Sequence, residues 1–230
     1  MNLIIFGPPG SGKGTYASRL ESKLGIKRIA TGDIFRDEIK KNTELGKKVV
    51  KFYNRGELVP DYITIEVLRK ALEEIVKKNF ILDGFPRTVE QAKALEKIVK
   101  IDAIINILAH EEILIEKTQA RRICSNTKCD GNYNLADIRK TIDNIEYILP
   151  PILPKKPGIC DKCGSELYQR ADDEDLELIK RRLRVYEEQS KPVIFFYKGK
   201  VRFIDIYMNR PPEQIVERIL QELKNIGLLP

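Results

Sequence analysis

Short apolar runs alternate along the chain with longer segments in which apolar residues recur every three or four positions. The runs predict strands of five to seven residues over 2–6, 79–83, 102–108 and 201–206, and 27–30 is a further short predicted strand. The longer segments predict helices over 12–24, 31–41, 43 onward, 61–78, 88–99, 111–122, 172–190 and 212–226. Strands that alternate with helices are typical of an α/β fold, here with a five-stranded parallel sheet covered on both faces.

Glycine and short polar residues mark several of the predicted helix ends. Gly25 follows the first helix and predicts its C-terminal end. The residues 31–33 offer capping side chains to the second helix, and Thr43 and Asp61 are expected to cap the next two.

The chain changes character between 123 and 169, which we call the cysteine segment. It holds four cysteines and four prolines and few helical repeats. At about 150 residues per domain, 230 residues correspond to one domain and a smaller piece. We therefore expect a core formed by 1–122 and 170–230, with the cysteine segment as a small inserted domain.

Composition narrows the class of protein. Hydrophobic residues make up 42% and charged residues 33%, which argues against disorder and against a membrane bundle. No apolar run reaches the ~18 residues of a membrane-spanning helix, and 1–6 begins as a strand rather than as a basic leader. We therefore expect a cytoplasmic protein with no membrane partner. Its excess of basic residues, 41 − 34 = +7, indicates an anionic partner without identifying it. The single histidine, His110, excludes sites built from several histidines and is expected in a surface loop.

All four cysteines lie in the cysteine segment, in the pairs Cys124/Cys129 and Cys160/Cys163. Such local pairs differ from the dispersed cysteines of a secreted disulfide framework and favour a tetrahedral thiolate site for structural zinc. Two reduced pairs that bind nothing, or a redox-active dithiol, are the alternatives.

A glycine-rich loop follows the first predicted strand. Residues 7–13, GPPGSGK, fit the pattern G-x-x-x-x-G-K, which lies between a strand and a helix in phosphate-binding loops. The glycines let successive amides point at phosphate oxygens, and Lys13 extends to the terminal phosphates. Gly14 stands where the general motif has Ser or Thr, and Thr15 follows it. The loop predicts nucleotide binding.

Further motifs make this prediction specific. They are ATGDIFR at 30–36, GELVPD at 56–61, DGFPR at 83–87 with Gln91 one helical turn beyond, and LYQRADD at 167–173. Together with the glycine-rich loop, they resemble adenylate kinases that carry a long, metal-bearing lid, and the resemblance spans nearly the whole chain. It implies a P-loop α/β fold, an AMP-binding insert at 31–60, a lid at 123–169, a monomer, and the reaction Mg·ATP + AMP ⇌ 2 ADP. Such an enzyme positions two nucleotides in line and neutralises charge, so an active site rich in Lys and Arg suits it.

The resemblance also assigns roles to residues. The ATP site comprises Gly10, Ser11, Gly12, Lys13, Gly14, Thr15 and Arg121. The AMP site comprises Thr31, Arg36, Val59, Gly84, Arg87, Gln91, Arg170 and Arg182. The catalytic side chains are those of Lys13, Arg87, Arg121, Arg170 and Arg182. Thr15 and Asp83 would hold Mg²⁺ through water, Cys124, Cys129, Cys160 and Cys163 would hold structural zinc, and Asp172 and Asp173 would hold the lid arginines.

The chain departs from the family pattern in two places. Lys117 stands where many relatives carry Arg, and it lacks the planar fork that binds phosphate. Thirty residues separate Cys129 from Cys160, and 136–158 contains an insertion that could form a hairpin, a helix or a mobile loop.

Two rival functions stay open on the sequence. One is a kinase of the same fold that acts on UMP, CMP or GMP, against which Thr31 and Gln91 favour AMP. The other is a zinc-knuckle protein that binds nucleic acid, which predicts clustered aromatic and basic residues near the cysteines. The aromatic residues of the cysteine segment are only three, Tyr133, Tyr147 and Tyr168, and they are not clustered. We therefore expect no nucleic-acid partner.

Overall fold

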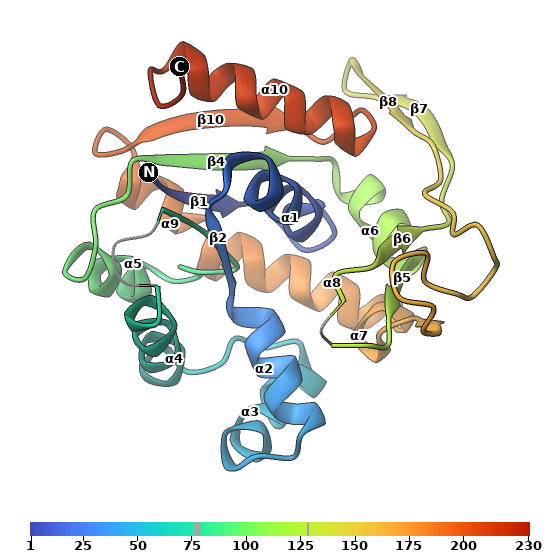
Figure 1. Cartoon of the computed structure of the whole chain (residues 1–230), viewed down its shortest axis with the longest axis horizontal. Coiled ribbons are helices and arrows are strands. Elements are labelled where there is room, and N and C mark those ends of the chain that lie inside the picture. The colour runs from blue at the N-terminus through green and yellow to red at the C-terminus, as the bar shows by residue number, and fades with distance from the viewer. Residues whose placement is uncertain (76–78, 128) are drawn as a thin grey trace.

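The computed structural model describes residues 1–75, 79–127 and 129–230 (Figure 1). Within them, the central sheet has the strand order β10-β4-β1-β3-β2, and every neighbouring pair is parallel. Its strands are β1 (Asn2–Phe6), β2 (Lys27–Ala30), β3 (Phe80–Asp83), β4 (Ala103–Leu108) and β10 (Arg202–Tyr207). The prediction of a five-stranded parallel sheet is confirmed.

Helices cover both faces of this sheet, as predicted. One face buries residues of α1 (Lys13–Leu24), α6 (Glu111–Gln119), α8 (Leu176–Val185) and α10 (Pro212–Asn225). The other face buries residues of α4 (Asp61–Glu73), α5 (Val89–Glu96) and α9 (Pro192–Tyr197). No helix in the described part of the chain is both long and apolar enough to span a membrane.

A third, small core lies in the helices that project from the sheet below β2 (Figure 1). Here α2 (Thr31–Lys40) and α3 (Glu44–Arg55) pack around Phe35 and Val49, with Val59 and Ile63 completing the cluster. This unit has its own apolar contacts, separate from those that hold the sheet.

The predicted caps are partly wrong. Thr43 caps α3, since its side chain accepts a hydrogen bond from the Gly46 amide at 3.0 Å. Thr31 and Asp61, in contrast, are the first residues of α2 and α4, whose cap positions carry no side-chain hydrogen bond. The Thr31 hydroxyl donates instead to the Gly84 carbonyl, which ties α2 to the end of β3. The fourth helix was predicted to run to 78, but α4 ends at Glu73, and 76–78 lie outside the described residues.

Two predicted helices are shorter than expected. The helix predicted for 111–122 ends at Gln119, because 121–124 forms strand β5 (Arg121–Cys124) between β6 (Asn132–Asn134) and β9 (Leu167–Tyr168). The helix predicted for 172–190 is divided into α7 (Ala171–Glu174), α8 and a π-helical turn (Tyr186–Ser190). The division falls at Asp175, whose extended backbone and carboxylate cap α8. Sequence analysis also missed α9.

The insertion in the cysteine segment forms a β-hairpin. Strands β7 (Ile138–Ile142) and β8 (Ile145–Leu149) pair in register around Asp143 and Asn144, both of which have positive φ, as a two-residue hairpin turn requires. Of the three conformations that the sequence left open, the hairpin is the one observed.

The hairpin packs on the core rather than on the cysteines. Its residues Ile138, Tyr147 and Leu149 are buried in the same cluster as Met208 and Ile215. Figure 1 shows it beside the end of α10. The Tyr147 hydroxyl accepts a hydrogen bond from the His110 amide at 3.1 Å. His110 lies in the loop before α6 with its side chain 39% exposed, as predicted, and its Nδ1 caps α6.

Hydrogen bonds and ion pairs also hold the hairpin. The Ile148 amide donates to the Asn209 carbonyl at 3.0 Å, and Arg210 pairs with Glu146 at 2.6 Å. On the other strand, Lys140 contacts two carboxylates of α6, at 2.6 and 2.8 Å. The hairpin therefore joins α6 to the loop before α10.

Candidate functional site

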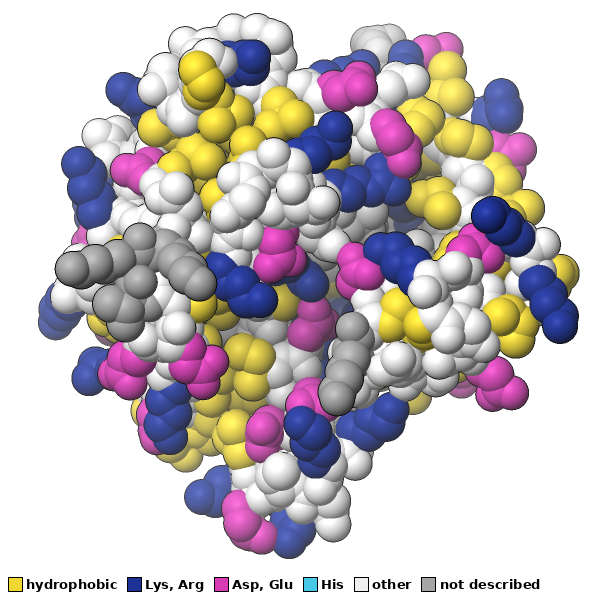
Figure 2. All heavy atoms as spheres, in the orientation of Figure 1, with side chains coloured by type: hydrophobic (Ala, Val, Ile, Leu, Met, Phe, Trp, Pro, Cys, Tyr) yellow, Lys and Arg dark blue, Asp and Glu magenta, His cyan; other side chains and the backbone are white. Residues whose placement is uncertain are grey.

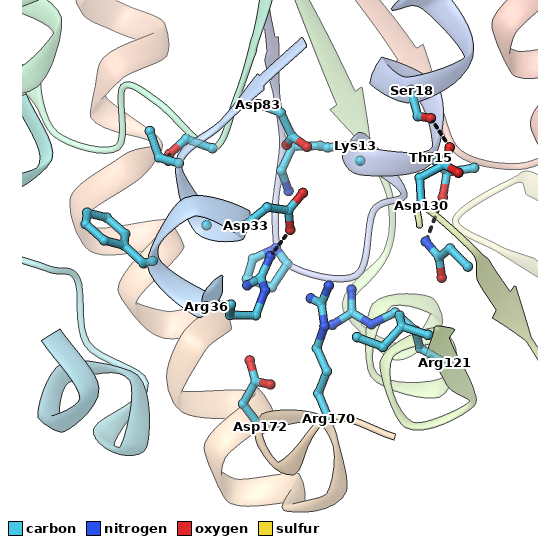
Figure 3. A pocket seen from close by; sticks show the side chains of 18 of the residues that line it. Lys13, Thr15, Ser18, Asp33, Arg36, Asp83, Arg121, Asp130, Arg170 and Asp172 are labelled. Atoms are coloured by element: carbon cyan, nitrogen blue, oxygen red, sulfur yellow. Dashed lines mark hydrogen bonds and ion pairs between the residues drawn. The ribbon is translucent and has the colours of Figure 1, made fainter. Parts of the chain in front are cut away.

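A cavity of about 1060 Å³ opens at the carboxyl ends of the central strands. Because β1 and β3 are parallel neighbours, the loop after β1 and the loop after β3 meet at the same edge. Figure 2 shows Lys, Arg, Asp and Glu side chains together around the hollow on this face, and Figure 3 shows the charged side chains that project into it from several elements.

The cavity brings together nearly all the predicted substrate-site residues. Those that line it are Gly10, Gly12, Lys13, Gly14, Thr15, Thr31, Arg36, Val59, Asp83, Gly84, Arg87, Gln91, Arg121, Arg170 and Arg182. Ser11 does not line it and is fully buried beneath the loop. Lys117 lies outside the lining as well, on the last turn of α6.

The glycine-rich loop wraps one end of the cavity. Gly7, Gly10 and Gly12 have φ values of 143°, 83° and 81°, which L side chains rarely adopt. The ammonium of Lys13 donates to the Pro8 carbonyl at 2.6 Å and so lies across the loop. Burial and, to a lesser degree, the nearby arginines lower the pKa of Lys13 to about 7, against the opposing effect of Asp83. An anion placed here would raise this pKa again.

Two arginines face the cavity from the side of α2 and the loop after β3. Arg36 forms an ion pair with Asp33, and Arg87 donates from Nε to the Gly84 carbonyl at 2.8 Å. Burial acts to lower both pKa values. Tyr53 and Asp33 reverse this for Arg36, whereas the pKa of Arg87 stays below its ordinary value. The guanidinium of Arg87 therefore lacks a compensating anion.

The side chain of Gln91 is fixed in orientation. Its Oε1 accepts from the Arg87 amide at 2.7 Å, and its Nε2 donates to Asp61 at 2.8 Å. One lone pair of Oε1 and one N–H stay available for a ligand. Asp61 thus orients Gln91, and its carboxylate makes this contact instead of capping a helix.

A second group of arginines converges from the two borders of the cysteine segment, at 121 and 170, and from α8. Arg121 makes a bidentate contact with the fully buried Asp173, at 2.8 and 2.6 Å. Arg182 pairs with Asp172 at 2.8 Å and with Asp173 at 3.3 Å. The neighbour of Arg121, Arg122, donates to the carbonyls of Gln119 and Arg121, outside the cavity lining.

Arg170 carries the least compensated charge of this group. Burial, together with the proximity of Arg36 and Arg121, lowers its pKa to about 9. Its buried Nε has no hydrogen-bond partner among the residues that the structure describes. In Figure 3 its guanidinium lies next to that of Arg121. Such crowding of like charges creates a site that favours a polyanion.

Two oxygen side chains are suited to a hard cation near the loop. Thr15 follows Gly14 at the start of α1, and Asp83 ends β3, so a hydroxyl and a carboxylate flank the phosphate-binding loop. Oxygen ligands of this kind match Mg²⁺, which retains several waters when bound. The donor set therefore fits a water-mediated magnesium site.

The four cysteines meet at one point of the cysteine segment. Their Sγ atoms all lie within 4.8 Å of one another, with Cys124 and Cys163 at 3.3 Å and Cys129 and Cys160 at 3.7 Å. A disulfide needs about 2.05 Å, whereas four thiolates about 2.3 Å from one zinc ion are about 3.8 Å apart. The cluster can hold zinc with no open coordination position.

The cysteine segment also touches the elements that form the rest of the cavity. Asp130 accepts from Ser18 at 2.6 Å, and Asn132 donates to Thr15 at 3.0 Å, as drawn in Figure 3. Lys40 on α2 donates to the Ser125 carbonyl at 2.9 Å. These contacts between distant parts of the chain cover the cavity, and the sequence motifs contain no signal for them.

Two further lining residues were not identified from the sequence. Tyr53 donates to the Gly32 carbonyl at 3.2 Å, and its ring makes an edge contact with Phe35. Arg28 forms ion pairs with Asp33 and Asp83. The only sequence signal for Arg28 is a charged residue in a short strand next to a recognised motif.

Comparison with known proteins agrees with this geometry. The adenylate kinase family model matches residues 5–202. The adenylate kinase of Archaeoglobus fulgidus is 42% identical over 98% of this chain and 100% of that protein. That of Caldicellulosiruptor saccharolyticus is 42% identical over 99% and 100%, and that of Methanosarcina mazei is 44% identical over 87% of each chain.

Proposed function

The chain belongs to the adenylate kinase family and is an ATP:AMP phosphotransferase, and on this premise we propose how its side chains divide the work of Mg·ATP + AMP ⇌ 2 ADP. The observation that carries the proposal is the convergence of the glycine-rich loop, Lys13 and two groups of arginines on one cavity. Phosphoryl transfer needs positioning and charge stabilisation more than covalent chemistry from the protein.

The loop end of the cavity takes ATP. The amides of 10–15 surround the phosphates, and Lys13 leaves the Pro8 carbonyl to contact the terminal phosphates. Arg121 reaches the same phosphates from the start of β5, at the border of the cysteine segment. Thr15 and Asp83 would hold Mg²⁺ through water, and the bound ion would supply charge neutralisation at the phosphates.

The other end takes AMP. Arg36 and Arg87 grip its phosphate with planar forks, and Gln91, oriented by Asp61, hydrogen-bonds the adenine edge. Thr31, Val59 and Gly84 complete the walls. This assignment places the acceptor phosphate opposite the donor phosphates.

Arg170 and Arg182 close over the phosphoryl group in transit. Arg182 is held by Asp172 and Asp173, so it is preorganised, whereas Arg170 has a free Nε and a depressed pKa that favour binding of new negative charge. Water is kept out because the segment bearing the cysteines lies over the cavity, which prevents transfer to water.

Two inserted segments of the chain move relative to a fixed core. The AMP-binding insert is 31–60, supported by its separate apolar cluster, and the lid is 123–169, supported by its own cluster around the cysteines. The core is 1–122 and 170–230. Within the lid, the hairpin β7–β8 stays with the core, to which its apolar residues belong. Monomeric state, cytoplasmic location and the lack of a nucleic-acid partner stay predictions from the sequence.

The acceptor specificity is tested by assaying ATP with each monophosphate. We expect AMP to give the highest kcat/KM, with CMP, UMP and GMP lower by tenfold or more, because a site with hydrogen bonds for one base leaves groups unpaired with another. Gln91→Leu should raise the KM for AMP and leave that for ATP near its wild-type value. Equal turnover of CMP or UMP would contradict the AMP assignment.

The four cysteines hold structural zinc in the lid. Purified protein should then contain about one zinc per chain, and chelation should lower the melting temperature, because the small cysteine cluster has few apolar contacts of its own. Cys163→Ser should reduce the zinc content, whereas Ser165→Ala, which keeps all four thiols, should not. A metal-free preparation whose melting is insensitive to chelator would contradict this role.

A further inference from the structure

Arg28 lies between two carboxylates at the edge of the cavity. Its Nη2 is 2.7 Å from Oδ2 of Asp83 and 2.8 Å from Oδ2 of Asp33, and its Nε is 3.3 Å from Asp83. The strand β2 pairs in parallel with β3, and the side chain of Arg28 runs toward the end of β3 that bears Asp83. Arg28 thus binds the carboxylate assigned to the magnesium waters.

This contact is partly shielded from solvent. The side chains of Arg28 and Asp83 are 18% and 11% exposed, so their attraction is screened less than that of a surface pair. Asp83 and Asp33 both raise the pKa of Arg28, against the effect of burial, and the guanidinium keeps its charge.

The position of Gly14 is explained by the same pair. A Cβ on Gly14 would lie 3.3 Å from Nη2 of Arg28 and 3.3 Å from Oδ2 of Asp83. The side chain of a Ser or Thr at this position would be in close steric contact with the ion pair. The Arg28–Asp83 contact therefore occupies the space in which the general motif places a hydroxyl.

The charges continue into the AMP site. Asp33, which Arg28 binds, also pairs with Arg36. Arg36, Asp33, Arg28 and Asp83 therefore form a row of alternating charges from the acceptor-phosphate arginine to the metal-side carboxylate. Figure 3 shows the Arg36–Asp33 member of this row below Asp83.

We propose that Arg28 is a positioning residue that holds Asp83 and Asp33 in place and competes with Mg²⁺ for their negative charge. The inference rests on the proposed function, because it takes Asp83 as the carboxylate that orients the magnesium waters. A cation within hydrogen-bond distance of Asp83 lowers the affinity of that carboxylate for a second cation. Arg28 thus fixes the geometry of the site at the cost of weaker metal binding.

The test measures Mn²⁺ binding to the protein saturated with ADP, by the electron paramagnetic resonance of free Mn²⁺. Arg28→Gln should tighten Mn²⁺ binding about five- to tenfold, because one partly buried positive charge is removed from two carboxylates. Arg28→Lys, which keeps the charge, should stay near wild type. Lys27 lies on the same strand but pairs with Glu21. The control variant Lys27→Gln, which also removes one positive charge, should therefore leave Mn²⁺ binding unchanged.

Activity gives a second readout. In Arg28→Gln, the Mg²⁺ concentration for half-maximal rate should fall while kcat falls several-fold, because Asp83 is no longer held in one place. A purely structural role for Arg28 would lower activity without shifting the metal dependence.

Two outcomes separate this inference from the proposed function. If Asp83→Asn weakens Mn²⁺ binding but Arg28→Gln binds as the wild type does, or more weakly, the competition by Arg28 is refuted and the role of Asp83 stands. If Asp83→Asn leaves Mn²⁺ affinity unchanged, the metal role of Asp83 fails, and the inference about Arg28 fails with it.

Discussion

A Lys13→Met variant is expected to lose about 10²- to 10³-fold in kcat. The ammonium of Lys13 is the side-chain cation of the glycine-rich loop, and removal of one preorganised donor to a developing charge costs about this much. Methionine is similar in length and can fill the same space, so the loop should keep its shape. Steady-state rates in the direction of ADP formation measure the effect, and Lys93→Met, an exposed lysine on α5, serves as the control.

The same lysine predicts a pH dependence. In the protein without nucleotide, burial lowers the pKa of Lys13 to about 7, so this side chain loses its proton as the pH rises through 7. The kcat/KM for ATP, which reports the free enzyme, should decline above pH 7. Phosphates raise the pKa in the complex, so kcat should hold to higher pH. An alkaline limb in kcat/KM that persists in Lys13→Arg would assign the titration to another group.

Stability should change in the opposite direction to activity. A lysine whose folded-state pKa lies below its unfolded value of 10.5 destabilises the folded protein fully below about pH 7, and this cost fades as the pH rises from 7 to 10.5. Lys13→Met should therefore raise the melting temperature of the nucleotide-free protein at pH 7. A lower melting temperature would show that the lysine stabilises the fold. The loss of activity could then not be assigned to the loss of a catalytic charge.

Asp173→Ala is expected to lower the free energy of unfolding by about 3–5 kcal/mol. The carboxylate is fully buried and contacts both Arg121 and Arg182, so its removal leaves Arg121 without its anion and Arg182 with Asp172 alone. Activity should fall as well, since both arginines lose their fixed position. Chemical denaturation followed by circular dichroism measures the loss.

Asp172→Ala is the matched comparison for this prediction. Asp172 precedes Asp173, but its side chain is 20% exposed, and the ion pair that it forms among the described residues is with Arg182. The loss of unfolding free energy should be about 1–2 kcal/mol, clearly below that of Asp173→Ala. Equal losses for the two variants would show that burial of the carboxylate is not what makes Asp173 important.

The central sheet was predictable because β1, β3 and β4 are nearly continuous apolar runs, as burial on both faces demands, and because helical periods separate the strands. The substrate-site residues were predictable because they sit in short motifs at the carboxyl ends of these strands, where Gly10, Thr31 and Asp83 are brought to one edge by parallel pairing. The helical prediction failed at 121–122, where the pairing of β5 with β6 and β9 overrides local periodicity.

Other features depend on contacts that no local pattern contains. The capping prediction failed for Asp61 because its carboxylate is used by Gln91, thirty positions away. Arg28 was missed because a strand of four residues gives no sign of what its side chain meets. The cysteine spacing suggested a metal cluster, but the packing of the insertion on the core depends on Tyr147 and its distant neighbours.

Packing of the hairpin on the core changes the number of chain connections between the lid and the core. The cysteine-bearing strands join the body through four stretches of chain, at 120, 136–137, 150–151 and 170, because the hairpin returns the chain to the core halfway. A unit that is joined to the core by four short connectors has less rotational freedom than a unit joined by two. It therefore samples fewer open orientations, so less conformational entropy is lost when it settles on bound nucleotide.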